Sequence, residues 1–274
     1  MHAQTEHKPP DFGHGAPTDK APGHWVLARL GKKVLRPGGI ELTRRMLETL
    51  DIGRDDQVVE FAPGMGATAR MTLQRHPAQY TAVEGDPEAA QRMGRLLREG
   101  NCRCVVGRAQ ASGLEAACAT VVYGEAMLTM HAASIKHRIV AEAARLLKSG
   151  GRYAIHEMAV TPDDAAESLQ AEIARELTGQ IRHAVQPLTP SGWRALLEAH
   201  DLEVSAQSTA PMHLLEPGRI LRDEGLAGTA RFLFNVLTHG DARRRVLAMR
   251  RVLQAYHDHL SAVVMVAAKR SSGG

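Results

Sequence analysis

The chain alternates between short apolar runs and longer segments whose apolar positions recur at helical spacing. Apolar runs typical of buried strands lie at 57–62, 80–85, 102–106, 119–124 and 152–160. Between them, apolar residues recur every three or four positions and predict helices at about 68–75, 87–100 and 134–147. Strands and helices that alternate in this way form parallel βαβ units, so we expect an α/β fold with helices on both faces of a sheet.

Further elements flank this alternating region. Before it, helical spacing over 21–36 ends at a Pro-Gly-Gly break, and a second helix is expected at 41–50. After it, the pattern predicts two helices and then two strands, at about 163–178, 191–200, 202–209 and 261–269. Residues 211–260, between the last two strands, carry a helical pattern rich in Arg and Leu, and so long an insertion is usually functional.

Composition places the chain among ordinary globular proteins. It has 274 residues, of which 44% are hydrophobic and 23% charged, so it can bury a sizeable core. The net charge of +4 is a mild excess, and aromatic residues make up only 4%. Because dedicated nucleic-acid binders carry larger basic patches and stack bases on aromatic side chains, we expect no nucleic-acid partner.

Cysteine usage and the first residues bear on the compartment. Three cysteines, at 102, 104 and 118, are too few for a disulfide scaffold and suit a reducing cytosol. No apolar run reaches the roughly 18 residues of a spanning helix, and residues 1–20 contain no apolar segment of a signal peptide. We therefore expect a cytoplasmic protein that begins with a flexible arm.

The turn after the first expected strand carries the most informative motif. It reads Glu60-Phe61-Ala62-Pro63-Gly64-Met65-Gly66, and a helix follows at once. Glycines at 64 and 66 allow a tight turn and a close approach of a ligand to the backbone. Glu84 ends the second expected strand, where a carboxylate can accept hydrogen bonds from both ribose hydroxyls. The combination predicts adenosine recognition, although alone it also fits a dinucleotide-binding fingerprint.

Several later motifs occur in the order found in one enzyme family. With Glu60 before the glycine turn, Glu84 in AVEGDPEAA, Gly107–Gln110, ATVVYGEAMLTM and the RLLKSGGR run at 145–152, the chain resembles the class I S-adenosylmethionine-dependent methyltransferases. The resemblance, in good register from about 55 to 160, implies a Rossmann-like, doubly wound, seven-stranded and mostly parallel sheet with an antiparallel last strand. It also implies S-adenosyl-L-methionine as cofactor and methyl transfer to a sulfur, oxygen or nitrogen atom of a small molecule by in-line displacement, which releases S-adenosylhomocysteine.

The resemblance also suggests how the chain is divided and which residues hold the cofactor. The expected segments are a flexible arm (1–20), N-terminal helices covering the site (21–52), a cofactor-binding core (53–210), a helical lid (211–260) and a last strand with tail (261–274). The expected cofactor-binding residues are Trp25, Glu60, Ala62, Pro63, Gly64, Gly66, Glu84, Gly85, Ala109, Gln110 and Gly124.

Two positions depart from the pattern of the family. Ala62 stands where the first glycine is usual, and Arg108 stands where an aspartate is common. The adenine amino group then needs another acceptor, for which Gln110 is the candidate.

Candidates for the acceptor side follow the fourth and fifth expected strands. Tyr123, Glu125, His131 and His156 are expected near the transferred methyl group, and His156 and Glu157 must point in opposite directions along a strand. A base matters only when the acceptor atom carries a proton that must leave. Histidine suits that work because it titrates near neutral pH, although a structural role is an equal alternative for His156.

Other features of the sequence bear on alternative functions. The Asn/Asp-Pro-Pro-aromatic tetrad of base-methylating members is absent after the fourth strand, and no His/Asp cluster has metal-ligand spacing, so we expect no metal. The arginines at 243–245 and 250–251 are typical of a solvated face, but also suit an anionic substrate, a partner subunit or weak contact with a membrane surface. The alternatives that remain open are a membrane-associated lipid or quinone methyltransferase and a catalytically idle cofactor-binding module, as monomer or homodimer.

Overall fold

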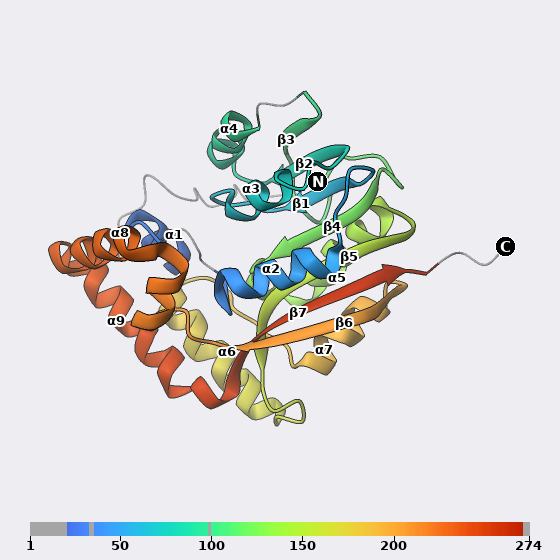
Figure 1. Cartoon of the computed structure of the whole chain (residues 1–274). Helices are drawn as coiled ribbons and strands as arrows, with labels where there is room; N and C mark the ends of the chain where they lie inside the picture. Colours follow the sequence, from blue (N-terminus) through green and yellow to red (C-terminus); the bar gives the residue numbers. More distant parts are fainter. Residues whose placement is uncertain (1–20, 33–35, 98–99, 271–274) are drawn as a thin grey trace, which may run out of the picture.

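The computed structural model describes residues 21–32, 36–97 and 100–270, which build a seven-stranded sheet (Figure 1). Its strands are β1 (Gln57–Phe61), β2 (Gln79–Glu84), β3 (Cys102–Val106), β4 (Ala119–Glu125), β5 (Leu147–Val160), β6 (Leu202–Pro211) and β7 (Leu260–Lys269). They lie in the order β3-β2-β1-β4-β5-β7-β6, and β7 is antiparallel to both neighbours while the other pairs are parallel. The expected fold class, including the antiparallel last strand, is confirmed.

Helices cover both faces of the sheet. One face carries α2 (Gly39–Leu50), α3 (Ala67–Leu73) and α4 (Pro87–Leu96), and the other carries α5 (Ala133–Leu146) and α7 (Pro190–Glu198). Because each strand of the centre is buried on both sides, eight consecutive residues of β5, 153–160, are buried. Local signals set two helix starts: Asp86 accepts a hydrogen bond from the Ala89 amide, and Thr189 accepts one from the Gly192 amide.

A third group of helices lies beyond one end of the sheet (Figure 1). It consists of α1 (Gly23–Arg29), α6 (Glu167–Ile181), α8 (Pro217–Thr238) and α9 (Gly240–Ala255). Their apolar faces form one cluster with the end of β5, which includes Leu27, Met158, Leu177, Phe232 and Met249. Helix α1 therefore shares one core with α8 and α9, although they are far apart in the sequence.

Element boundaries differ from the expectations at several places, such as α6, which was expected at 163–178. The helix expected over 21–36 ends at Arg29, because Gly31 adopts a left-handed φ of 98°. The fifth strand begins at Leu147 rather than 152, and α8 is kinked at Gly225, whose φ is 71°. The expected arm, 1–20, lies outside the described residues. Within the described ranges, no helix combines the length and apolarity that crossing a membrane requires.

Candidate functional site

A cavity of about 1220 Å³ lies at the carboxyl ends of the parallel strands and continues beneath the third group of helices. Its position follows from the topology, because the connections after the neighbouring strands β1 and β4 leave to opposite faces of the sheet. Sites for one small ligand span roughly 300–1,000 Å³. The cavity is therefore large enough for two molecules to bind side by side.

The first compartment of the cavity is the turn after β1. Ala62, Gly64 and Gly66 all have left-handed backbones, with φ of 51°, 56° and 71°. A Cβ placed on Gly64 would meet no atom closer than 4.0 Å, so the backbone there faces open space. Gly66 is the N-cap residue of α3, and Thr68 in the first turn of this helix lines the cavity. The turn fits a ligand that approaches the backbone closely.

Glu84 lines this compartment beside the turn. Its Oε1 accepts a hydrogen bond of 3.0 Å from the Asp86 amide, which fixes the carboxylate at the end of β2. Burial raises the pKa of Glu84, and the amides of Asp86, Gly85 and Gly64 partly offset that effect. A carboxylate held in this way can accept hydrogen bonds from a diol.

Glu60 lies behind the turn, fully enclosed. Its Oε2 accepts hydrogen bonds from the hydroxyls of Tyr80 and of Tyr123, the latter at 2.7 Å. Burial raises the pKa of Glu60 to about 7, against the lowering effect of the two tyrosine hydrogen bonds. Tyr123 is also hydrogen-bonded to Thr72, at 2.7 Å, so its hydroxyl is fully engaged within the core. Together these contacts tie β1, β2, β4 and α3 to one carboxyl group.

A buried network joins the segment before α2 to the ends of β4 and β5. Glu125 accepts hydrogen bonds from Arg36 (2.5 Å), Thr43 (2.6 Å) and Thr68, and from Nδ1 of His156 (2.7 Å). The pKa of Glu125 falls to about 2, because Arg36 and His156 outweigh the burial that would raise it.

His156 is enclosed by two acceptors. Its Nε2 donates to the Pro37 carbonyl at 2.5 Å, while Nδ1 faces the Glu125 carboxylate. The ring thereby ties the Pro37 backbone, which lines the cavity, to the sheet.

Glu157 points to the other face of the sheet and holds the loop after β4. Its two oxygens accept hydrogen bonds from the amides of Met127, Leu128 and Thr129 at 2.8–3.0 Å, and from the Thr129 hydroxyl at 2.7 Å. These contacts cap the short helix Leu128–Met130, from which Met130 and the following His131 face the cavity.

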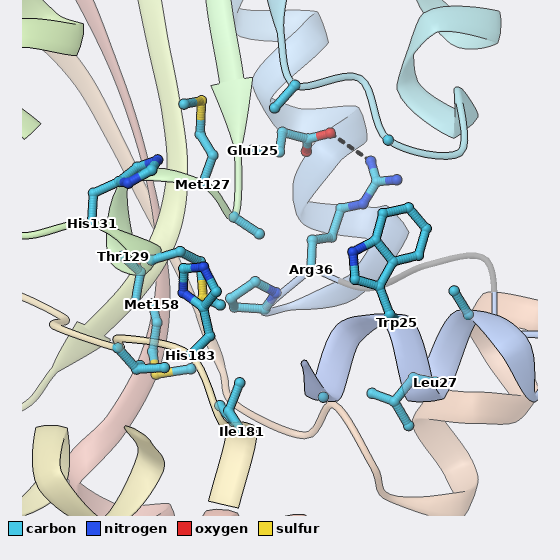
Figure 2. A pocket seen from close by; sticks show the side chains of 18 of the residues that line it. Trp25, Leu27, Arg36, Glu125, Met127, Thr129, His131, Met158, Ile181 and His183 are labelled. Atoms are coloured by element: carbon cyan, nitrogen blue, oxygen red, sulfur yellow. Dashed lines mark hydrogen bonds and ion pairs between the residues drawn. The ribbon is translucent and has the colours of Figure 1, made fainter. Parts of the chain in front are cut away.

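The second compartment is mainly apolar (Figure 2). Its apolar lining comes from α1, α6, α9, the end of β5, the short helix Leu128–Met130 and nearby loops: Leu27, Met130, Met158, Leu177, Ile181, Val185, Met212, Leu214, Leu215, Met249, Val252 and Leu253. Figure 2 shows Trp25 beside Arg36 on one wall, and His131 and His183 with Met158 on the other. Burial lowers the pKa of His131, and the nearby His183 and Lys136 lower it further. A neutral imidazole therefore borders an apolar space next to the glycine turn.

Most residues expected at the cofactor site line this cavity. They are Trp25, Glu60, Ala62, Pro63, Gly64, Glu84, Gly85, Ala109 and Gln110, together with Arg108. Gly66 and Gly124 stand just behind the wall, where a Cβ on Gly124 would lie 2.8 Å from Met127 Sδ.

Of the acceptor-side candidates, the structure brings two to the cavity and leaves two behind it. Glu125 and His131 line the wall. Tyr123 and His156 are fully buried and hydrogen-bonded within the core. The prediction that either side chain contacts an acceptor is therefore wrong, and both residues have structural positions. Arg36 and His183 also line the cavity, but the sequence did not predict them because neither belongs to a motif. Only the tertiary structure places these two residues at the cavity.

Among the described residues, no group of three or more His, Cys, Asp or Glu side chains is arranged to hold a metal ion.

Comparisons with known proteins agree with this geometry. A family model described as a methyltransferase domain matches residues 59–155. A protein of Haemophilus influenzae described as uncharacterized is 31% identical over 219 residues, which cover 78% of this chain and 85% of that protein.

Solved structures share the fold at low identity. A sarcosine dimethylglycine methyltransferase from Galdieria sulphuraria, itself described as putative, has a TM-score of 0.66 at 14% identity, with 84% of each chain covered. Geranyl diphosphate C-methyltransferase from Streptomyces coelicolor, in complex with S-adenosyl-L-homocysteine, has a TM-score of 0.58 at 15% identity and covers 84% of this chain and 79% of its own. The [4+2]-cyclase SpnF reaches 0.66 at 14% identity, with 90% and 93% covered, so the fold also serves other chemistry.

Proposed function

The chain belongs to the class I S-adenosylmethionine-dependent methyltransferases, and on that premise we propose that it methylates a sulfur, oxygen or nitrogen atom of a small, largely apolar molecule. One observation carries the proposal: a single cavity joins the glycine turn and Glu84 to an apolar compartment bordered by histidines. The two compartments correspond to a cofactor and an acceptor held side by side.

The residues of the first compartment fit S-adenosyl-L-methionine. Glu84 would accept hydrogen bonds from the ribose hydroxyls, and the open backbone at Gly64 and the amides at the start of α3 would receive the amino-acid end. Gln110 lines the same compartment and offers an acceptor for the adenine amino group in place of the usual aspartate. When bound, the cofactor supplies a methyl group made electrophilic by its sulfonium, and S-adenosylhomocysteine leaves after the transfer.

The second compartment positions the acceptor and excludes water. Apolar side chains of α6 and α9 enclose the space, which favours in-line alignment of an apolar acceptor with the methyl group. His131 is neutral near pH 7 because its pKa is lowered, so it can take the proton that leaves a hydroxyl, thiol or amine as the new bond to carbon forms. Arg36 and Glu125 neutralise each other at the junction of the compartments.

Calorimetry with S-adenosylhomocysteine tests the cofactor assignment. We expect micromolar binding, and Glu84→Ala should weaken it by roughly 1–3 kcal/mol because two buried hydrogen bonds are lost. Glu88→Ala is the matched control, since that side chain is 67% exposed on α4 and should leave the affinity unchanged. Absence of binding by the wild-type protein would refute cofactor binding.

A panel of acceptors tests catalysis. S-adenosylhomocysteine release is followed with apolar thiols, phenols, hydroxylated quinones and amines of increasing chain length. We expect turnover with at least one class, and His131→Asn should lower kcat more than it changes KM. Cofactor binding without turnover of any class would favour the idle-module alternative.

A further inference from the structure

The outer face of α8 carries apolar side chains that no described residue covers. Leu226 is 80% exposed, Leu237 68%, Phe234 65% and Leu233 49%. These residues recur at intervals of seven, eight and eleven from Leu226, so they lie along one stripe of the helix. Monomeric soluble proteins rarely keep so many large apolar side chains together at the surface, and such a patch marks an interaction site.

The exposed charged side chains of α8 and α9 are almost all positive. Arg222, Arg231, Arg243, Arg244 and Arg251 are exposed on α8 and α9. Three acidic residues lie on the same two helices, but Asp223 and Glu224 have side chains at most 1% exposed and face Lys32. Asp241 is the exposed acid of these two helices and pairs with Arg244. The exposed parts of these two helices therefore combine large apolar side chains with an excess of positive charge.

We propose that this face, formed by the apolar stripe of α8 and the exposed arginines of α8 and α9, binds the surface of an anionic lipid bilayer. Exposed leucine and phenylalanine insert at the boundary between headgroups and acyl chains, and arginines contact the lipid phosphates. A second copy of this chain is disfavoured as the occupant, because two such surfaces would bring like charges together.

The arrangement also links the surface to the cavity. Helix α9 presents Arg243, Arg244 and Arg251 outward, while its opposite side contributes Met249, Val252 and Leu253 to the apolar compartment. A bilayer bound to this face therefore lies one helix away from the apolar compartment. The binding itself does not depend on methyl transfer, so the two proposals can fail separately.

Vesicle co-sedimentation with the purified full-length chain tests the proposal. We expect binding to vesicles of phosphatidylglycerol and phosphatidylcholine at low salt, and binding that is weaker in high salt or to phosphatidylcholine alone. The double variant Phe234→Ser/Leu237→Ser should weaken binding roughly tenfold or more, since both side chains leave the lipid boundary. Val106→Ser, at a 63% exposed position on β3, is the matched control.

A second pair of variants tests the charges. Arg243→Gln/Arg251→Gln should reduce the salt-dependent part of the binding, whereas Arg54→Gln/Arg95→Gln, at exposed positions elsewhere, should not. Absence of binding to anionic vesicles at low salt would overturn the proposal. So would equal binding by the Ser variant and the wild-type chain, or sedimentation equilibrium showing that the stripe holds a dimer together.

Discussion

Replacing Glu125 by Gln removes the negative charge at the centre of the buried network while keeping the size of the side chain. Glu125 receives hydrogen bonds from Arg36, Thr43, Thr68 and His156, and its side chain is 8% exposed. The amide of Gln offers one oxygen in place of two and adds donors where donors already point inward. The guanidinium of Arg36 then lies buried without its counter-charge.

The stability that Glu125→Gln should lose can be worked out in two ways, which agree. Removing one partner of a buried ion pair destabilises a protein by about 3–5 kcal/mol. The pKa of Glu125 lies at about 2 in the folded protein against 4.5 ordinarily, and a difference of that size corresponds to roughly 3 kcal/mol. We therefore expect Glu125→Gln to lower the free energy of unfolding by about 3 kcal/mol.

The pH dependence gives an independent signature. Because the folded pKa is depressed, the contribution of Glu125 is complete above pH 4.5 and is lost as the pH falls from 4.5 toward 2. The wild-type protein should lose stability across that window, and the variant should lose less.

Urea unfolding followed by circular dichroism, repeated from pH 7 to pH 3, measures both effects. Glu48→Gln, at an exposed position of α2, is the matched control and should stay within about 0.5 kcal/mol of the wild type. A loss below about 1 kcal/mol for Glu125→Gln, or an unchanged pH dependence, would refute the reasoning.

Three further predictions concern stability and follow from single contacts, each measured by urea unfolding. Ala62→Gly should raise the free energy of unfolding by about 0.5–1 kcal/mol, because the left-handed backbone at φ 51° disfavours a Cβ. Ala69→Gly, within α3, is the control and should lower the free energy of unfolding. A less stable Ala62→Gly variant would show that the backbone at position 62 is not strained. Glu157→Gln should cost about 2–4 kcal/mol, because its NH₂ group would replace one carboxylate oxygen and face at least one backbone amide that now donates to that oxygen. A neutral effect would mean that other contacts hold the loop. Lys32→Met should cost about 3–5 kcal/mol, because it removes the ammonium group that lies 3.7 Å from the buried carboxylates of Asp223 and Glu224. An unchanged urea midpoint would show that these ion pairs do not stabilise the fold.

The order and type of the sheet elements followed from the sequence alone. Strands buried on both faces are apolar runs, and turn residues and segments with helical spacing flank each run. The local pattern of apolar residues is therefore sufficient to locate these strands. The glycine turn and Glu84 were found for the same reason, because the chemistry is carried by residues adjacent to strand ends. Prediction failed at Arg29, where the apolar spacing continues but Gly31 turns the backbone left-handed.

The acceptor compartment and the charge networks were decided by the tertiary structure. Glu125 meets Arg36 across 89 residues of sequence, and His156 meets Pro37 across 119. The same is true of His131 and His183, which lie on separate loops that face one cavity. Periodicity states which face of an element is apolar but not which distant element covers it. Segments 21–52 and 211–260 were therefore recognised as helical from the sequence. The shared core of α1, α8 and α9 depends instead on packing between distant elements, which no local pattern encodes.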